Sequence, residues 1–479
     1  MKLMSLVAGW LSLGLPAAAP PTEPVAPLKA QALQELQARY ADYRQVALQI
    51  WGFAEVGYKE TRSSALLQKT LRDQGFKVEA GVAGIPTAFV ASYGSGQPVI
   101  GILAEFDALP GLSQQGGAEK RPVAGQDAGH GCGHHLFGTA SVAAGIALKK
   151  LLREGKLRGT VKVFGTPAEE GGSGKVYMVR AGLFKDVDAV LHWHPSSVNQ
   201  AMMATFLANS SAKFRFHGVS AHAAAAPQRG RSALDGVEAM NHMVNMMREH
   251  VPQETRIHYV ITSGGKAPNV VPDFAEVYYY VRHPSREQVS AVFARVVKAA
   301  EGAALGTGTT VDHEIIGGTH DLLLNETLGR AVQRNLEQVG GVSYSAQDEA
   351  FGRQIQASLG APAPPLASAA TVQPFGPSDG GGSTDVGDVS YVVPTVGLMA
   401  ATFVPGTPGH SWQAVACGAQ ESGTKGMMVA AKTLALTAID LYTDAALLTK
   451  AQEEFRQDVG SYVYKPLLGD RQPALNYRD

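Results

Sequence analysis

Hydrophobic and polar positions follow two different periods along the first part of the chain. Apolar residues recur at helical spacing from Leu33 to Ala47, which predicts a first helix that begins near residue 28. A second helical pattern covers about 136–153. Strand-like apolar runs stand before and after it, at 87–93, 99–105, 160–165 and 189–193. Strands that alternate with helices are typical of an α/β domain with a largely buried sheet.

A different order of elements begins near residue 207. The pattern predicts strands and helices in the order βαββαβ, at 213–217, 232–250, 256–262, 276–282, 285–303 and 309–316. This is the split βαβ, or ferredoxin-like, arrangement of a four-stranded sheet with two helices on one face. The period of two in 276–282 places Val277, Tyr279 and Val281 on one face. The opposite face, which includes Arg282, is free to contact a partner or a ligand.

The first pattern resumes after about residue 321 and ends in a long apolar-periodic helix at 425–442. The chain has 479 residues, more than the ~250–300 at which a single hydrophobic core stops growing. We therefore expect a discontinuous α/β domain of two or three layers, formed by 28–206 and 321–479. The ferredoxin-like unit is expected as an insertion at 207–320.

The charge balance argues against polyanionic partners. Lys and Arg number 41 against 42 Asp and Glu, so the chain has no basic excess for binding nucleic acid or anionic lipid. Its composition, 45% hydrophobic and 17% charged, is typical of a soluble globular enzyme. After residue 20, no stretch has the ~18 consecutive apolar residues of a membrane helix.

The N-terminal residues differ in character from the rest. Lys2 precedes an apolar run at 3–15 and Pro and Ala residues at 16–19, which predicts a signal peptide at 1–20 and export, most simply into a bacterial periplasm. The alternative is a frayed N-terminus or a single anchor, although the run is short for a bilayer. An oxidising compartment would allow Cys132 and Cys417 to pair.

Residues 130–135, with the sequence HGCGHH, concentrate metal-ligand types directly before a predicted helix. Cys132 and His134 lie two residues apart on a glycine-rich turn, so both can point at one ion, and a helix N-terminus favours the thiolate. The alternative is a free cysteine buried beside solvated histidines. The density of the cluster favours the metal site.

Further candidate residues follow predicted strands. Glu169 and Glu170 follow the strand at 160–165. In such a pair one carboxylate can bind a cation while the other transfers protons, although an isolated Glu pair is usually solvated surface. His192 and His194 lie on the same face of the next strand. The C-terminal edge of an α/β sheet is where such sheets place their sites.

Two other residues stand in loops. Asp107 follows the strand at 99–105, where it either orients a ligating imidazole or caps a turn. His410 lies in a glycine-flanked loop far along the chain.

Four of these segments match a known family in order. They are GHGCGH at 129–134, PAEEG at 167–171, HWHP at 192–195 and PGHSW at 408–412. The sequence resembles the two-metal amidohydrolases of the aminoacylase and glutamate-carboxypeptidase family, and within it the branch of the p-aminobenzoyl-glutamate hydrolase catalytic subunit. The resemblance extends from about residue 35 to 440.

The resemblance implies two divalent metal ions, Mn²⁺ or Zn²⁺, and roles for particular residues. Its implied metal ligands are Cys132 as the bridging group, His134, Glu170, His194 and His410. Glu169 would be the general base, and Asp107 would orient a ligand. His192 remains a competing ligand to His194. His135 stands where relatives have Asp or Asn.

In the inserted domain the resemblance implies a lid and a dimer contact. His222 would stabilise the developing oxyanion, in the family's dimers at the neighbouring subunit's site. Asn269 and Arg282 would bind the carboxylate end of the substrate, and an arginine fork suits a planar carboxylate. A homodimer is therefore expected.

The expected function is metal-dependent hydrolysis of the amide bond of N-acyl or N-aroyl amino acids such as p-aminobenzoyl-glutamate. One alternative is an amide hydrolase with Cys132 as its nucleophile, which would not depend on metal. Another is a catalytically silent exported binding protein on the same fold. The sequence does not choose the acyl group or the metal.

Overall fold

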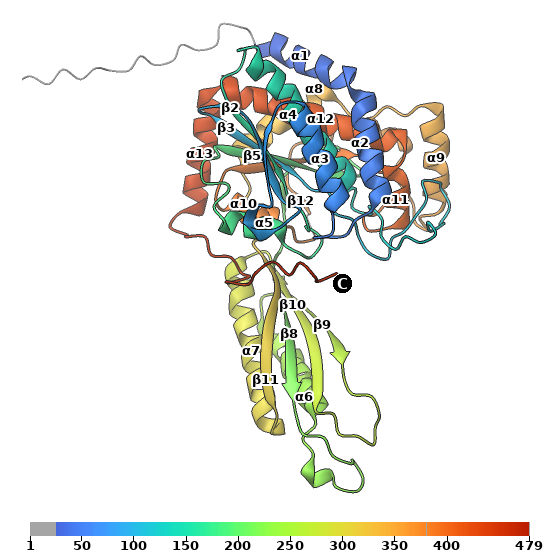
Figure 1. Ribbon diagram of the computed structural model, residues 1–479, viewed down its shortest axis with the longest axis vertical. Coiled ribbons are helices and arrows are strands. Elements are labelled where there is room, and N and C mark those ends of the chain that lie inside the picture. The colour runs from blue at the N-terminus through green and yellow to red at the C-terminus, as the bar shows by residue number, and fades with distance from the viewer. Residues whose placement is uncertain (1–24, 380, 479) are drawn as a thin grey trace, which may run out of the picture.

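The computed structural model describes residues 25–379 and 381–478, which form a helix-covered body and an elongated body projecting from it (Figure 1). The predicted signal peptide at 1–20 lies outside the described residues. Within the described ranges, no helix combines the length and the apolar character needed to span a bilayer.

The larger body is built on a seven-stranded mixed sheet. Its strands, in spatial order, are β1 (Lys77–Ala80), β2 (Phe89–Ser95), β4 (Gly159–Gly165), β3 (Val99–Ala104), β5 (Ala189–Ser196), β13 (Thr395–Ala401) and β6 (Gln200–Met202). The central strands β4, β3, β5 and β13 run parallel, so their C-terminal ends share one edge. Every residue of β3 is buried, as expected for a strand covered on both faces.

Helices pack against this sheet and against one another. The long ones are α1 (Val25–Ala38), α2 (Tyr40–Phe53), α3 (Thr61–Asp73), α4 (His134–Arg153), α8 (Glu326–Val339), α12 (Glu421–Thr443) and α13 (Ala445–Val459). Shorter elements are α5 (Gly174–Arg180), α9 (Ala346–Ala357), α10 (Val386–Ser390), α11 (Trp412–Gly418) and the paired strands β7 (Ala204–Thr205) and β12 (Ser378–Asp379). Helix α4 is buried from His134 to Leu148 because it packs between the sheet and outer helices.

One predicted helix is two in the structure. The expected first helix near residue 28 begins at Val25 and breaks at Arg39, where φ is -107° and ψ is 15°. The apolar spacing continues through the break because both helices bury one face in the same core. Hydrophobic periodicity therefore does not reveal the break.

The projecting body confirms the βαββαβ prediction. Its elements are β8 (Ala208–His217), α6 (Ala233–Met247), β9 (Arg256–Ser263), β10 (Phe274–His283), α7 (Arg286–Thr307) and β11 (Thr310–Thr319). The antiparallel sheet has the order β11-β8-β10-β9, and both helices pack on it around a core of their own. Val277, Tyr279 and Val281 are buried in that core, as the period of two predicts.

Strand β8 starts five residues before the predicted strand at 213–217. Its first residues include Asn209, Ser210 and Ser211, whose polarity hides the strand from a hydropathy pattern. They are buried because β8 is an inner strand, paired with β10 on one side and β11 on the other.

Candidate active site

Parallel strands of the large sheet deliver polar side chains to the same edge. Glu105 and Asp107 follow β3, Glu169 and Glu170 follow β4, and His194 belongs to β5. The site faces a cavity of about 760 Å³ whose wall also includes residues of β8, β10 and β11. The cavity therefore lies between the two bodies, at the edge where α/β sheets place ligands.

A glycine turn positions the Cys-Gly-His segment. Gly133 adopts a φ of 81°, and a Cβ added to it would lie 2.7 Å from the Cβ of Pro195. Only glycine fits this close approach in a left-handed conformation. Helix α4 begins at the next residue, so Cys132 and His134 stand at either side of its N-terminus.

The predicted metal ligands lie in two groups that share one residue. Cys132, His134 and His194 form the first group, and Cys132, Glu170 and His410 form the second, with the ligand atoms of each group within 4.8 Å of one another. The Cys132 Sγ lies 3.3 Å from His194 Nε2, and Glu170 Oε1 lies 3.2 Å from His410 Nε2. All five residues named from the sequence are thus brought together.

This donor set fits two divalent ions. Thiolate, imidazole and carboxylate are ligands of Zn²⁺ and related metals. His134 Nε2 and Glu170 Oε1 are buried and form no hydrogen bond with a described residue, although a Glu105 oxygen and a His410 nitrogen lie 3.1 Å and 3.2 Å from them. Buried polar atoms of this kind require a partner, which a bound cation would provide. Cys132, common to both groups, is placed to bridge.

His192 shares a strand face with His194 but belongs to none of the ligand groups formed by described residues. Its ring packs against Gly397, where a Cβ would lie 2.5 Å from the imidazole. Burial lowers the pKa of His192 to about 3. The geometry therefore favours His194 as the ligand.

Asp107 connects the two ligand groups. Its Oδ1 accepts a hydrogen bond from His134 Nδ1 at 2.9 Å, and its Oδ2 accepts one from the Glu170 backbone N–H at 2.9 Å. Burial acts to raise the pKa of Asp107, but His134, the Glu170 backbone N–H and Lys175 together outweigh it and lower the pKa. Asp107 therefore stays ionised and fixes the imidazole with Nε2 facing the site.

Glu169 lies beside a buried charge network. Burial, together with the charges of Glu105 and Glu170, raises the pKa of Glu169 well above its usual range. Lys175, on α5, binds Glu105 at 2.7 Å and Asp385 at 2.6 Å, and all three side chains are buried. The other Glu105 oxygen lies 3.1 Å from His134 Nε2.

Sequence reasoning did not find this network. Glu105 stands two residues before Asp107, a spacing that could have signalled a second polar residue at the strand end. Lys175 and Asp385 carry no such signal, because 210 residues separate them. Only the packing of α5 against α10 brings them together.

Glu60 is another residue that the sequence did not indicate. Its Oε1 accepts a hydrogen bond at 2.8 Å from the backbone N–H of Ala168, which adopts a φ of 56° directly before Glu169. Burial raises the pKa of Glu60 to about 8. The turn that carries both glutamates is therefore held by carboxyl groups on two sides, those of Glu60 and Asp107.

The inserted domain contributes one of its three predicted residues to the cavity. Arg282 lines it, from the end of β10 next to the large sheet. The loops at 218–231 and 264–273 lie at the end of the projecting body away from the large body (Figure 1). His222 and Asn269 are exposed in these loops, where Ala223 N–H donates to the Asn269 carbonyl at 3.0 Å. A single chain does not bring these two residues to the cavity.

The structure also settles the Cys132–Cys417 pairing and the position of His135. Cys132 and Cys417 are both free, and Cys417 is buried in a separate cluster with Phe403 and Ala414, so they form no disulfide. His135 turns away from the site and contacts the Gly418 carbonyl through Nε2 at 3.0 Å.

The sequence is similar to known proteins over most of its length. Residues 101–354 match peptidase family M20/M25/M40. One of the p-aminobenzoyl-glutamate hydrolase subunits of Escherichia coli (strain K12) is 42% identical over 460 residues, which cover 90% of this chain and 95% of that protein. The Xaa-Arg dipeptidase of Mus musculus is 30% identical over 424 residues, covering 85% and 87%.

A solved structure has the same fold. The crystal structure of a Bacillus subtilis dinuclear metal binding peptidase from the M20 family superposes with a TM-score of 0.59 at 17% identity, covering 85% of this chain and 99% of that one. At 17% identity this structural similarity shows only that the fold is the same. The family membership is shown by the sequence matches. The chain therefore belongs to peptidase family M20/M25/M40 and is a hydrolase of peptide-like amide bonds.

Proposed function

We propose that this chain hydrolyses N-acyl and N-aroyl amino acids that carry a carboxylate, with p-aminobenzoyl-glutamate as a substrate. The observation that carries the proposal is the pair of ligand groups sharing Cys132, next to Glu169 in a cavity that also contains Arg282. The Escherichia coli relative is named for this substrate.

In this proposal Cys132, His134, Glu170, His194 and His410 hold two divalent ions, either Mn²⁺ or Zn²⁺. Ions bound there supply Lewis-acid polarisation of the amide carbonyl and a lower pKa for water. Glu169 accepts the proton of the attacking water and returns it to the leaving amine. Burial raises the pKa of this carboxyl, which suits a group that must hold a proton between the two steps.

Substrate binding in the proposal uses Arg282 within one chain and His222 and Asn269 from a second. The exposed position of the last two, far from the cavity of their own chain, supports a homodimer in which each inserted domain reaches the other subunit. A complex with a different polypeptide is the alternative, since the bacterial relative is named as one subunit of its enzyme.

A cysteine nucleophile is less consistent with the site. Burial raises the pKa of the Cys132 thiol, and burial lowers the pKa of His194 beside it. An activated thiolate–imidazolium pair needs both shifts in the opposite direction. If Cys132 is instead a metal ligand, the bound cation compensates the negative charge of its thiolate, and no imidazolium is needed.

The test is a panel of amides assayed by product release, with EDTA and with added Mn²⁺ or Zn²⁺. We expect release of p-aminobenzoate that EDTA abolishes and metal restores. Glu169→Gln should bind metal normally and lose activity by about 10²–10⁴-fold. Glu79→Gln, an exposed residue of β1, is the matched control. EDTA-resistant turnover, or near-full activity of Glu169→Gln, would contradict the proposal.

We also propose that the chain is exported to the periplasm, on the basis of residues 1–20 alone. Expression of the full chain, followed by fractionation and N-terminal sequencing, should give periplasmic protein without the leader. Cytoplasmic protein with an intact N-terminus would contradict export.

A further inference from the structure

The C-terminal tail leads from the outside of the large body to the cavity. After α13 ends at Val459, residues 461–478 form no helix or strand. The tail crosses the narrow junction between the two bodies (Figure 1). Its course therefore brings the last residues of the chain close to a site built mainly from the first half.

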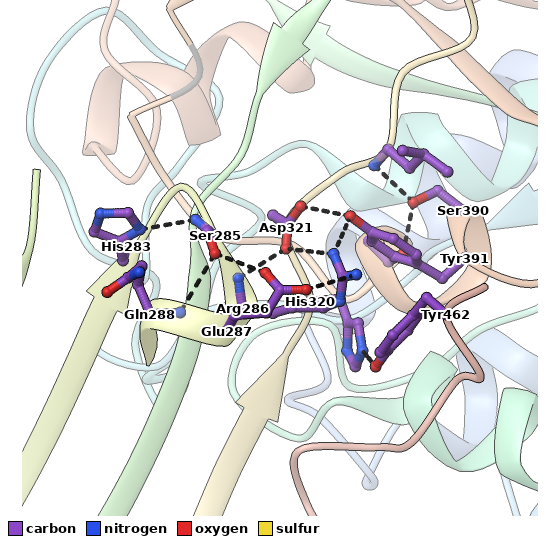
Figure 2. Close-up of polar contacts among 12 residues, drawn as sticks. His283, Ser285, Arg286, Glu287, Gln288, His320, Asp321, Ser390, Tyr391 and Tyr462 are labelled. Carbon is purple, nitrogen blue, oxygen red and sulfur yellow. Dashed lines mark hydrogen bonds and ion pairs between the residues drawn. The ribbon is translucent and has the colours of Figure 1, made fainter. Parts of the chain in front are cut away.

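The tail is fixed at the junction by the residues that connect the two bodies. Tyr462 Oη contacts His320 Nε2 at 2.8 Å, directly after β11. The Arg286 guanidinium at the start of α7 lies over the rings of Tyr462 and Tyr391, 3.9 Å and 4.2 Å from their centroids. Figure 2 shows this cluster, in which Arg286 also donates to Tyr391 Oη at 2.6 Å.

Further along, the tail contacts both bodies. Arg471 forms an ion pair with Glu314 of β11 at 3.1 Å. From the large body, Arg180 at the end of α5 donates to the carbonyls of Gly469 and Arg471 at 2.9 Å and 2.7 Å. Because side chains hold its backbone at several points, the tail has a defined path to the cavity.

The tail ends on the turn that carries the two glutamates. Tyr477 Oη donates to the Glu170 carbonyl at 3.0 Å, and Arg478 Nη2 donates to the same carbonyl at 2.5 Å. Gly57 makes room for this arrangement, because a Cβ there would lie 2.2 Å from the Tyr477 hydroxyl. Arg478 is part of the cavity wall.

Arg478 brings to the cavity a positive charge that no described residue pairs. Among the described residues it has no carboxylate partner, and its Nε is buried without a hydrogen bond. Arg282, from β10, has the same two properties and lines the same cavity. A buried guanidinium N–H without an acceptor is unfavourable, and a ligand carboxylate satisfies it with two parallel hydrogen bonds.

We propose that Arg478 is a specificity-determining residue that binds an acidic group of the substrate, so that the C-terminal tail is a working part of the active site. Two unpaired guanidinium groups in one cavity match a substrate with two carboxylates, one for Arg282 and one for Arg478. This inference rests on the proposed function and narrows its substrate class to N-acyl derivatives of dicarboxylic amino acids.

The competing explanation is structural, because Arg478 also holds the Glu170 carbonyl. A residue that only supports the turn affects every substrate alike, whereas a carboxylate-binding residue affects only substrates that carry that carboxylate. Tyr477 donates to the same carbonyl without a charge. Tyr477→Phe is therefore the matched control for the structural role.

The experiment compares wild type, Arg478→Gln, Arg478→Lys and Tyr477→Phe on p-aminobenzoyl-glutamate and its two monoamides, p-aminobenzoyl-glutamine and p-aminobenzoyl-isoglutamine. For Arg478→Gln we expect kcat/KM on the diacid to fall about 10- to 100-fold, mainly through KM. One monoamide should be nearly unaffected, and Arg478→Lys should recover part of the loss. Tyr477→Phe should change all three substrates by the same factor. An equal loss on all three substrates in Arg478→Gln overturns the proposal.

A binding measurement separates this inference from the proposed function. Calorimetric titration with L-glutamate and its two monoamides, L-glutamine and L-isoglutamine, requires no hydrolysis. Arg478→Gln should weaken L-glutamate binding about 10-fold or more and leave one of the two monoamides unchanged. That result supports the inference even if no amide in the panel is cleaved. Equal weakening of all three ligands, or of none, in Arg478→Gln would overturn it even if hydrolysis is observed.

Discussion

Asp107 holds one residue of each proposed metal-ligand group, so its replacement by asparagine tests how the site is organised. The substitution keeps the shape of the side chain and removes its charge. It also replaces one acceptor oxygen by an NH₂ donor. In the wild type both oxygens accept hydrogen bonds, at 2.9 Å from His134 Nδ1 and 2.9 Å from the Glu170 backbone N–H.

Neither orientation of the new amide satisfies both partners. If the NH₂ faces Glu170, two donors meet and the turn must shift. If it faces His134, the imidazole proton moves to Nε2, the nitrogen proposed to bind metal. At least one hydrogen bond to a charged group is lost, worth about 1.5–3 kcal/mol. That energy corresponds to roughly 10- to 150-fold in affinity.

The assay is competition for Mn²⁺ or Zn²⁺ with a chromophoric chelator, together with kcat/KM at saturating metal. We expect Asp107→Asn to bind metal roughly 10- to 150-fold more weakly and to lose activity that excess metal only partly restores. The exposed residue Asp186, changed to Asn, serves as the control.

An Asp107→Asn protein that binds both ions as tightly as wild type would refute the reasoning. It would mean that the orientation of His134 and Glu170 does not depend on Asp107, despite the two hydrogen bonds. Circular dichroism of both variants excludes unfolding as the cause of any loss.

Three further predictions concern stability. Lys175→Met leaves the buried carboxylates of Glu105 and Asp385 without their cation. The free energy of unfolding, measured in urea, should therefore fall by about 3–5 kcal/mol. An unchanged free energy of unfolding would contradict the ion network. Burial raises the pKa of Glu60 to about 8 from 4.5, so the stability that its protonated form contributes is present at low pH and lost as pH rises towards 8. Relative to Glu60→Gln, wild type should therefore lose stability between about pH 5 and 8, by at most about 1.4 kcal/mol per pH unit, and parallel pH profiles would argue against it. EDTA should lower the Tm and added Mn²⁺ or Zn²⁺ should restore it, whereas a Tm indifferent to both would speak against bound ions.

The sequence located the metal-ligand candidates because they lie in short segments at strand ends. Cys132 and His134 are two residues apart, and Glu170 and His194 each belong to or follow a strand with a clear apolar pattern. Parallel neighbouring strands end at one edge, so such residues meet whatever the order of the strands. The choice between His192 and His194 needed the structure, since both point to the same face.

Other parts of the site had no local signal. Glu60 reaches the turn of Glu169 and Glu170 from 108 residues away, and Arg478 reaches it from 308. Lys175 resembles an ordinary helix residue in sequence, yet it is fully buried. For His222 and Asn269 the situation is reversed. The sequence indicated both residues, but a single chain does not bring them to the cavity, because their proposed roles depend on a second subunit.

Periodicity and spacing alone determined the α/β class, the βαββαβ insertion and a set of metal-ligand candidates, because these follow from interactions between residues close along the chain. Tertiary structure alone decided which carboxyl groups hold the turn of Glu169 and Glu170, which charges pair in the interior, and which residues the C-terminal tail contacts. Those contacts join segments separated by hundreds of residues, and their energies depend on burial, which no single segment specifies.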